Sequence, residues 1–487
     1  MRVALDPTWS RGAVARVAAQ GAATLLRALL LGATTAAVVT LAGPEAGLLL
    51  VLALVATFAA VRMPGAVLAA LVLVPFYKAA IQPYIPVDIT AILAGLNVLQ
   101  VIPVLRDHRP RSWSNSGLIL WGAFGLLVLA TVLYAPDQQL ALGTAVGFWG
   151  LVIGPITPAA LRCAREPRHI REFLWTVFLA GVVVVALGLA QLLEGQPTGG
   201  APLVVLGANT IAVGRAALLV PLLGLTFILQ ARIPGARAAM IVLTPAAFVV
   251  AIASGSRGPL LVVLALGGLG LLDYVNRPQR PDWRLVTAVA GAVLAVLLVT
   301  IGSGALPAQS VQRFATFGGF IQGAVTSAPE TSAADTSSQT RVELFGAALA
   351  MFEERPILGW GVSSFATTSP RFLGASRGDA YPHNAVLQIA AELGLVGLLA
   401  LAGLVLLGLA RRLPRGPMAI VRLLFLFFFL NAMVSGDILA DRMTWALLML
   451  LLVADAAPTS EEKPTLVPVL TPTRSPGARH SSRWIRA

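Results

Sequence analysis

The sequence has few charged residues, a single cysteine and four widely separated histidines. Only 12% of its 487 residues are Asp, Glu, Lys or Arg, whereas soluble domains contain roughly 25%. Cys163 has no second cysteine to pair with, which excludes a disulfide framework. No His, Cys, Asp or Glu cluster has metal-ligand spacing, and no glycine-rich loop precedes a Lys-Ser or Lys-Thr pair. We therefore expect no metal or other cofactor and no ATP hydrolysis.

Hydrophobic residues make up 57% of the chain, and they gather in runs of about 20 residues, the length that crosses a bilayer as a helix. Inside a bilayer the backbone must satisfy its own hydrogen bonds, so such runs form helices. The sequence therefore predicts an all-α polytopic membrane protein with about 12 to 14 transmembrane helices. The predicted spans are 25–42, 46–61, 66–82, 88–105, 117–134, 139–161, 172–193, 209–230, 238–254, 259–275, 285–303, 384–410, 418–435 and 439–455.

Basic residues set the predicted topology. The formal net charge is +13, but hydrophobic spans separate the arginines into clusters, so we do not expect nucleic-acid binding. The positive-inside bias puts the clusters and both termini in the cytoplasm. The basic clusters are residues 2–16, 62, 106–111, 162–171, 232–237, 277–284, 411–415 and the tail.

One predicted external connection is far larger than the others. We divide the chain into an N-terminal transmembrane bundle (1–303), a large external loop (304–383), C-terminal transmembrane helices (384–455) and a disordered cytoplasmic tail (456–487). The smaller external connections are 83–87, 135–138, 194–208, 254–258 and 436–441.

The large loop is expected to contain a surface helix. Residues 326–340 are rich in Ser, Thr and Ala and are predicted to be flexible. The sequence Thr340-Arg341-Val342-Glu343 has the pattern of a capping box, which predicts a helix from Thr340 to about Pro356. Its apolar face would lie on the membrane surface or on the outer mouth of the bundle. That face comprises Leu344, Phe345, Ala348, Leu349 and Phe352.

Two arginines are predicted to be external although the positive-inside bias disfavours them there. They are Arg215, early in the 209–230 span, and Arg257 in the turn 254–258. A guanidinium presents forked donors that match phosphate oxygens, so the two could hold a lipid pyrophosphate. The alternative is snorkelling to the interface or pairing with a carboxylate. Arg341, in the loop helix, is a third candidate that could instead be merely solvated.

The segment Tyr381-Pro382-His383-Asn384 stands where the large loop re-enters the membrane. The His383 imidazole could accept a proton near neutral pH, or it could simply bond to the backbone at the helix entry. Asn384 could support the site or only cap the helix. Glu392 would be costly to bury unless paired or protonated, so it either structures the site or faces water. Lys78 presents the same choice, with snorkelling the favoured role. Asp437 and Asp441 could act as carboxylates in the site, with helix capping the favoured role.

Taken together, these motifs resemble the O-antigen ligase and O-antigen polymerase superfamily of bacterial envelope glycosyltransferases. The resemblance covers about 100 residues directly, and it rests on the order in which several motifs follow one another along the chain. The matching pieces are the 209–215 region, Ser256-Arg257-Gly258, Arg341, Ala347-Ala348-Leu349-Ala350-Met351-Phe352, Pro356-Ile357-Leu358-Gly359-Trp360-Gly361, His383-Asn384-Ala385-Val386-Leu387-Gln388 and Glu392-Leu393-Gly394-Leu395-Val396-Gly397.

The resemblance implies an inverting, metal-independent glycosyltransferase with a GT-C-like helical fold in the bacterial inner membrane, its active site facing the periplasm. The donor would be an undecaprenyl-pyrophosphate-linked glycan, and the acceptor a glycan, lipid or protein. Carried over by position, Arg215 and Arg257 would bind the pyrophosphate, Arg341 would assist, and His383 would activate the acceptor hydroxyl. Asn384 and Glu392 would support them.

Two features depart from the family pattern: Pro382 stands where a small residue is more usual, and about fourteen spans exceed the expected twelve. The choice between ligase and polymerase stays open, as does the identity of the acceptor. The competing hypotheses are a transporter or flippase of a lipid-linked glycan and a non-catalytic scaffold. The sequence shows no internal repeat, which counts modestly against a transporter.

Overall fold

The computed structural model describes residues 58, 62–106, 116–195, 201–228, 235–275, 283–304, 306–315, 336–373, 381–411, 416–438 and 441–454. Within these residues the regular structure is helical, without β-strands. Seven of the described helices are long and apolar enough to cross a membrane, and a bent pair would make an eighth. Four further apolar helices in this part of the chain have 10–17 residues. The predicted all-α polytopic membrane fold is confirmed.

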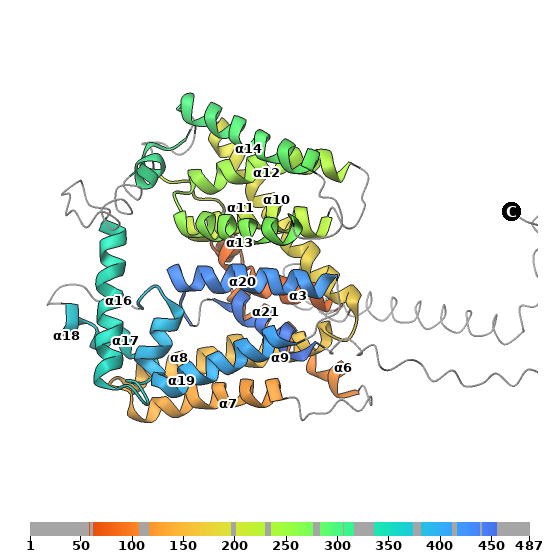
Figure 1. The fold of residues 1–487 in the computed structure, drawn as a ribbon. Helices are drawn as coiled ribbons and strands as arrows, with labels where there is room; N and C mark the ends of the chain where they lie inside the picture. The colour runs from red at the N-terminus through yellow and green to blue at the C-terminus, as the bar shows by residue number, and fades with distance from the viewer. Residues whose placement is uncertain are drawn as a thin grey trace, which may run out of the picture.

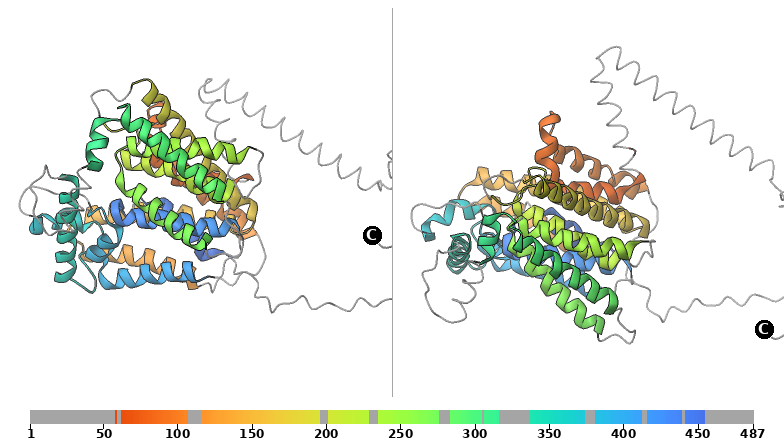
Figure 2. Two further views of the ribbon diagram at one scale, coloured as in Figure 1. Left: turned by 45° about the horizontal axis from the view of Figure 1, so that its top comes forward. Right: turned by 90° about the horizontal axis from the view of Figure 1, so that it is seen from above.

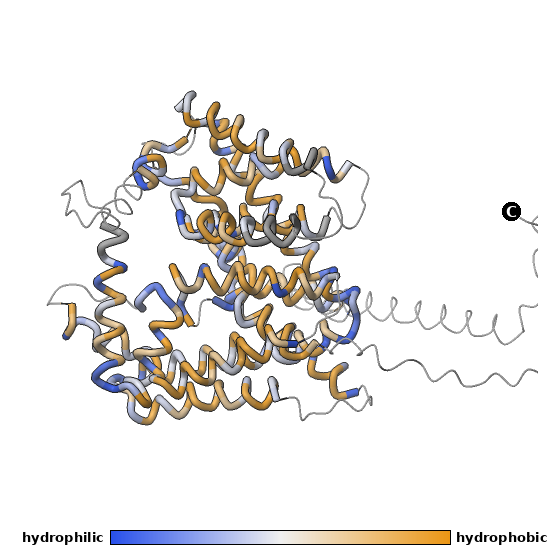
Figure 3. The backbone as a smooth tube through the Cα atoms, viewed as in Figure 1, coloured by the Kyte–Doolittle hydropathy of each residue, from blue (hydrophilic) through white to orange (hydrophobic). Residues whose placement is uncertain are grey.

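The apolar helices run side by side as a bundle (Figure 1). Their apolar residues extend along the bundle, and hydrophilic residues gather toward helix ends (Figure 3). The helices are α3 (Pro64–Val72), α4 (Val74–Ile81), α5 (Ile89–Val98), α6 (Val101–Arg106), α7 (Ser116–Ala130), α8 (Gln138–Phe148), α9 (Gly154–Cys163), α10 (Pro167–Leu193), α11 (Thr210–Leu223), α12 (Ala236–Ala253), α13 (Arg257–Val275), α14 (Trp283–Gly302), α19 (Ala385–Ala410), α20 (Pro417–Ser435) and α21 (Arg442–Val453).

Each predicted span from 66–82 onward corresponds to a helix or a pair of consecutive helices. The predicted spans 25–42 and 46–61 lie outside the described residues, apart from residue 58, as does the predicted tail 456–487. The span 66–82 is bent by 77° between α3 and α4. Pro75 at the start of α4 explains the bend, because proline cannot donate the backbone hydrogen bond that would continue the helix.

Lys78 of α4 forms an ion pair with Asp88 rather than standing alone at the membrane edge. Asp88 is the N-cap residue of α5 and accepts a hydrogen bond from Thr90 N (2.7 Å). The hydrogen bond from the Lys78 ammonium lowers the pKa of the Asp88 carboxyl to about 2. The Asp88 carboxyl therefore stays ionised at physiological pH, and the ion pair joins α4 to the start of α5.

The helix α21 is buried from Met443 to Val453. Its Trp445 ring contacts the rings of Trp121, Phe124 and Phe148, with centroids 5.5–5.7 Å apart. A helix that is apolar all round belongs in the interior of a bundle. Asp441, which directly precedes α21, is therefore held at a fixed position at the end of the bundle.

The loop helix α16 (Thr336–Glu354) lies across the ends of the bundle helices in all three views (Figures 1 and 2). Its buried residues Leu344, Ala348 and Met351 pack against Trp360 and Phe365. The predicted end near Pro356 agrees with the structure.

The predicted start of α16 at Thr340 is wrong, since the helix already includes Thr336. Thr340 therefore lies inside the helix and does not open it, and residues 336–340 of the segment predicted to be flexible are helical. A cap contributes only about 1 kcal/mol, so packing along the helix can override it. Leu349, predicted on the buried face, is exposed because Ala347 and Met351 complete that face instead.

The predicted continuous helix 384–410 is broken, because Gly394 adopts φ +64° and ψ −159°. The loop from Pro356 to Gly361 fills the break. Leu395 N donates to Pro356 O (2.7 Å), Trp360 N to Ala391 O (3.0 Å) and Gly361 N to Glu392 O (2.8 Å). These bonds satisfy backbone groups that the break would otherwise leave unpaired.

We expect Gly394→Ala to destabilise the protein strongly. The conformation of Gly394 costs about 1–3 kcal/mol for any other residue, and an added Cβ would stand 2.4 Å from Ile357 O. The measurement is the thermal unfolding midpoint in detergent. The control is Gly346→Ala in α16, where a Cβ meets nothing within 4 Å and alanine favours the helix. Equal stability of the two variants would contradict this account of the break.

Candidate functional site

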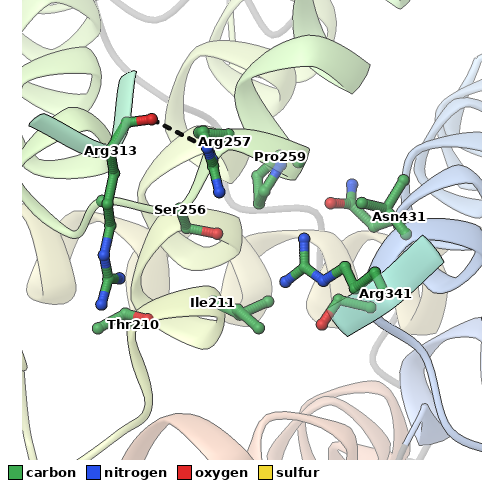
Figure 4. A pocket seen from close by; sticks show the side chains of 12 residues that line it. Thr210, Ile211, Ser256, Arg257, Pro259, Arg313, Arg341 and Asn431 are labelled. Carbon is green, nitrogen blue, oxygen red and sulfur yellow. Dashed lines mark hydrogen bonds between the residues drawn. The ribbon is translucent and has the colours of Figure 1, made fainter. Parts of the chain in front are cut away.

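A cavity of about 200 Å³ opens at the end of the bundle that α16 crosses. Its walls are the first turns of α11 and α13, the turn before α13, the helical residues 308–315, the last turn of α20 and α16 (Figure 4). The lining residues are Thr210, Ile211, Gly255, Ser256, Arg257, Gly258, Pro259, Arg313, Arg341, Asn431, Val434 and Ser435.

Three arginines from three different elements line the cavity. They are Arg257 at the start of α13, Arg313 and Arg341. The lining residues include no Asp or Glu. In Figure 4, Arg257 and Arg341 point toward the space beside Ser256, and Arg313 extends toward Thr210. Such a set of forked cationic donors attracts an anion with several oxygen atoms, such as a phosphate group.

Two helix N-termini add to this positive potential. The first turn of α11 contributes Thr210 and Ile211 to the cavity, and Asn209 caps that helix by accepting from Ala212 N (2.8 Å). The first turn of α13 contributes Arg257, Gly258 and Pro259. Since a helix N-terminus carries a partial positive charge and unpaired N–H groups, both helices favour an anion here.

The turn before α13 depends on Gly255. It has φ +69°, and a Cβ there would lie 3.2 Å from Ser310 Oγ and 3.3 Å from Arg313 Cδ. Two hydrogen bonds hold residues 308–315 against this turn. They run from Ser310 Oγ to Ala253 O (2.7 Å) and from Arg257 Nη1 to Arg313 O (2.9 Å). Glycine at this position thus allows residues 308–315 to bring Arg313 beside Arg257.

Arg215 is not among the lining residues of the cavity, although it bonds to two of them. It is 9% exposed and forms an ion pair with Asp441 (Nη1 to Oδ1, 3.0 Å). Its Nη2 donates to Asn431 O (3.1 Å) and Ser435 O (3.0 Å) in the last turn of α20. Pairing with a carboxylate, the alternative raised from the sequence, is what the structure shows. This geometry favours a positioning role for Arg215.

Asp441 does not cap α21 as predicted. It occupies the N-cap position but makes no capping hydrogen bond. Its carboxylate instead accepts from Arg215 and from Asp437 N (3.2 Å). The ion pair with Arg215 satisfies the carboxylate better than a backbone N–H would, because both partners of the pair are charged.

Glu392 is fully buried in α19 and belongs to a polar network. Its Oε1 accepts from Phe365 N (3.3 Å), and Gln388 Nε2 lies 3.5 Å from Oε2. Gln388 also donates to Asp437 Oδ1 (3.3 Å) and accepts from Ile438 N (3.1 Å). The network continues through Asp437 and Asp441 to Arg215. Of the two roles raised for Glu392, the geometry favours the structural one.

His383 immediately precedes the helix that this network anchors. Its backbone is left-handed, with φ +56°, and its ring centroid lies 4.5 Å from that of Tyr381. Asn384 caps α19, as expected for this position, by accepting from Val386 N (3.0 Å) and Leu387 N (3.1 Å). A non-glycine residue with this backbone is uncommon and often marks a functional site.

His383 is not among the residues that line the cavity, but α16 links the two. Arg341 near the start of α16 lines the cavity, and Met351 farther along packs in one cluster with Ala391 of α19. The starts of α13 and α19 both lie at the end of the bundle that α16 crosses (Figure 1). The structure therefore brings Arg257 and Arg341 together at one cavity and holds His383 at the same end of the bundle.

Sequence reasoning missed Arg313 and the network role of Gln388. Arg313 carries the same signal that selected Arg257, an arginine in a predicted external connection, where the positive-inside bias disfavours it. Gln388 gave no such signal, because its partners are Glu392 on its own helix and residues of a distant turn.

The comparisons with known proteins give one family match, over part of the chain. Residues 241–402 match the family model described as O-antigen ligase, and this segment contains Arg257, Arg313, Arg341 and His383. The predicted resemblance to the O-antigen ligase and polymerase superfamily is confirmed. The match covers about a third of the chain and supports, at the level of the family, a membrane protein of the ligase or polymerase type. No curated protein and no solved structure matches the chain.

We expect Asp441→Ala to lower the free energy of unfolding by about 3–5 kcal/mol, because it leaves the buried Arg215 guanidinium without its carboxylate. The measurement is denaturation in detergent. The matched control is Glu354→Ala, which removes the half-exposed pair with Arg371 (3.8 Å) and should cost at most about 1 kcal/mol. A similar loss in both variants would argue against a special role for the buried pair.

We expect Glu392→Gln to be tolerated and Glu392→Leu to be destabilising. Glutamine keeps an acceptor for Phe365 N, whereas leucine leaves that buried N–H without a partner, at a cost of about 1–3 kcal/mol. Thermal unfolding of both variants tests this. If leucine were as stable as glutamine, the network would not be holding α19.

Proposed function

We propose that the protein transfers a glycan from an undecaprenyl-pyrophosphate carrier to an acceptor hydroxyl, as an O-antigen ligase or polymerase. The observation that carries the proposal is the cavity lined by Arg257, Arg313 and Arg341 and by no acidic residue. Guanidinium groups match pyrophosphate oxygens in charge and in geometry. The family match supports the same class of substrate.

The location of the cavity fits a lipid-linked donor. It lies at the ends of apolar helices, where the first turns of α11 and α13 begin. A pyrophosphate at this level would leave the polyprenyl chain beside apolar helix surfaces and the glycan toward α16. At a bilayer interface the polyprenyl chain of such a donor would likewise lie in the membrane and its glycan in water. We accordingly place this end of the bundle at the periplasmic face of the bacterial inner membrane.

In the proposed reaction His383 accepts the proton of the acceptor hydroxyl as its oxygen attacks the anomeric carbon. The bond from that carbon to the pyrophosphate breaks, and its electron pair goes to the phosphate oxygen. Attack opposite the leaving group inverts the anomeric configuration. Arg257 and Arg341 stabilise the charge that grows on the pyrophosphate, a task that preorganised donors perform well. Arg215 holds the cavity wall and does not touch the donor. Asn384 and Glu392 hold the helix behind His383.

The reaction needs the sugar between the arginine cavity and His383. The loop helix α16 borders this region, since it contributes Arg341 to the cavity and packs on α19. In this proposal the acceptor approaches from the side of α16 and Tyr381. The large external loop then serves to hold donor and acceptor together, which is how positioning lowers a barrier.

We expect His383→Asn to abolish transfer while the protein stays folded. Asparagine tolerates the left-handed backbone at this position but cannot act as the base. General-base catalysis contributes about 10²–10⁴-fold, so the initial rate of glycan transfer in proteoliposomes should fall by that factor.

The control for this experiment is Arg371→Gln, at an exposed arginine of the same loop that does not line the cavity. Full activity of His383→Asn would reject the base assignment. A wild-type protein that moves the lipid-linked glycan across the bilayer without transferring it would instead identify a flippase.

A further inference from the structure

Arg313 differs from the other two cavity arginines in its place and its surroundings. It comes from the helical residues 308–315, whereas Arg257 and Arg341 come from α13 and α16. Its main chain is fixed by the hydrogen bond from Arg257 Nη1 to Arg313 O (2.9 Å). Its side chain passes Gly255 and extends toward Thr210, away from Arg341 (Figure 4). The cavity therefore has a third cationic group, which lies near Thr210 and apart from the other two.

The charge of the substrate changes during the proposed reaction. The donor is a pyrophosphate diester, in which each phosphate carries one negative charge. When the bond from the anomeric carbon breaks, the electron pair stays on the phosphate oxygen and the leaving group becomes a pyrophosphate monoester. A terminal phosphate loses its second proton at a pKa of about 6, so the leaving group carries close to three charges at pH 8. Three guanidinium groups match this product better than they match the donor.

We propose that Arg313 binds the departing undecaprenyl pyrophosphate more strongly than it binds the intact donor. This inference rests on the proposed function and adds a binding residue to it. Arg257 and Arg341 face each other across the space beside Ser256, where they serve the two charges of the donor. Arg313, together with the N-terminus of α11 at Thr210, adds to their stabilisation of the charge that appears as the glycosidic bond breaks. The positive charge is already in place when that negative charge develops.

The test compares two lipids on the full chain in nanodiscs at pH 8. One is undecaprenyl pyrophosphate, and the other is the same lipid with one N-acetylhexosamine on its terminal phosphate. The wild type should bind the monoester about tenfold more tightly than the diester, because an extra charge-assisted contact forms. Arg313→Gln should reduce this preference to about threefold or less, with binding of the diester nearly unchanged. In turnover, kcat should fall more than KM rises.

Two variants keep the test decisive. Arg313→Lys retains the charge and should keep most of the preference for the monoester, whereas a purely structural role would not separate Lys from Gln in this way. Arg371→Gln removes an exposed arginine that does not line the cavity and should leave the preference unchanged. An equal loss for both lipids in Arg313→Gln, or an unchanged preference, would overturn the inference.

Failure of this inference can be told from failure of the proposed function, because binding is measured without turnover. A wild-type protein that binds both lipids but transfers no glycan would overturn the function alone. Active transfer with a preference that does not depend on Arg313 would overturn this inference alone.

Discussion

The ion pair between Arg215 and Asp441 fixes the end of the bundle at which the cavity lies. It joins α11 to the turn before α21 across 226 residues of sequence, and α21 itself is buried. A guanidinium and a carboxylate that are both this well buried are stable only together. Because Arg215 also binds two carbonyl groups of α20, the same pair sets the cavity wall that contains Asn431 and Ser435. This contact therefore joins the end of α20 to α11.

The break in α19 explains why the sequence around it has glycines at two separated positions. Gly394 adopts a conformation open essentially to glycine alone, and Gly359 lies so close that a Cβ would stand 2.4 Å from Glu392 C. With no side chain at either position, the loop after α16 can enter the break and bond to its backbone. The loop thereby ties α16, and with it Arg341, to the helix that follows His383. The glycines at positions 359 and 394 thus have a structural role, whatever the residues around them do in the reaction.

The sequence predicted many of the described helices and the cap of α19. Long apolar runs have one solution in a bilayer, so helix positions could be predicted, and Asn384 before an apolar run predicted its own capping role. The break at Gly394 could not be seen, because an isolated glycine in an apolar run is common in membrane helices. The partner of Arg215 could not be identified either, since contacts between residues 226 apart leave no local pattern. Arg313 was within reach of the positive-inside argument that selected Arg257.

The electrostatics of α20 give Arg215 a role that requires no contact with a ligand. The last turn of α20 borders the cavity through Val434 and Ser435, and a helix C-terminus carries a partial negative charge on its unpaired carbonyl groups. Left alone, that helix end would repel an anion held by Arg257 and Arg341. Arg215 donates to the carbonyl oxygens of Asn431 and Ser435. These hydrogen bonds reduce the partial negative charge of the helix end, and with it the repulsion. Asp441 is not among the lining residues, and its ion pair keeps Arg215 in place. An arginine in a predicted external position can therefore matter to an anion site without being one of its ligands.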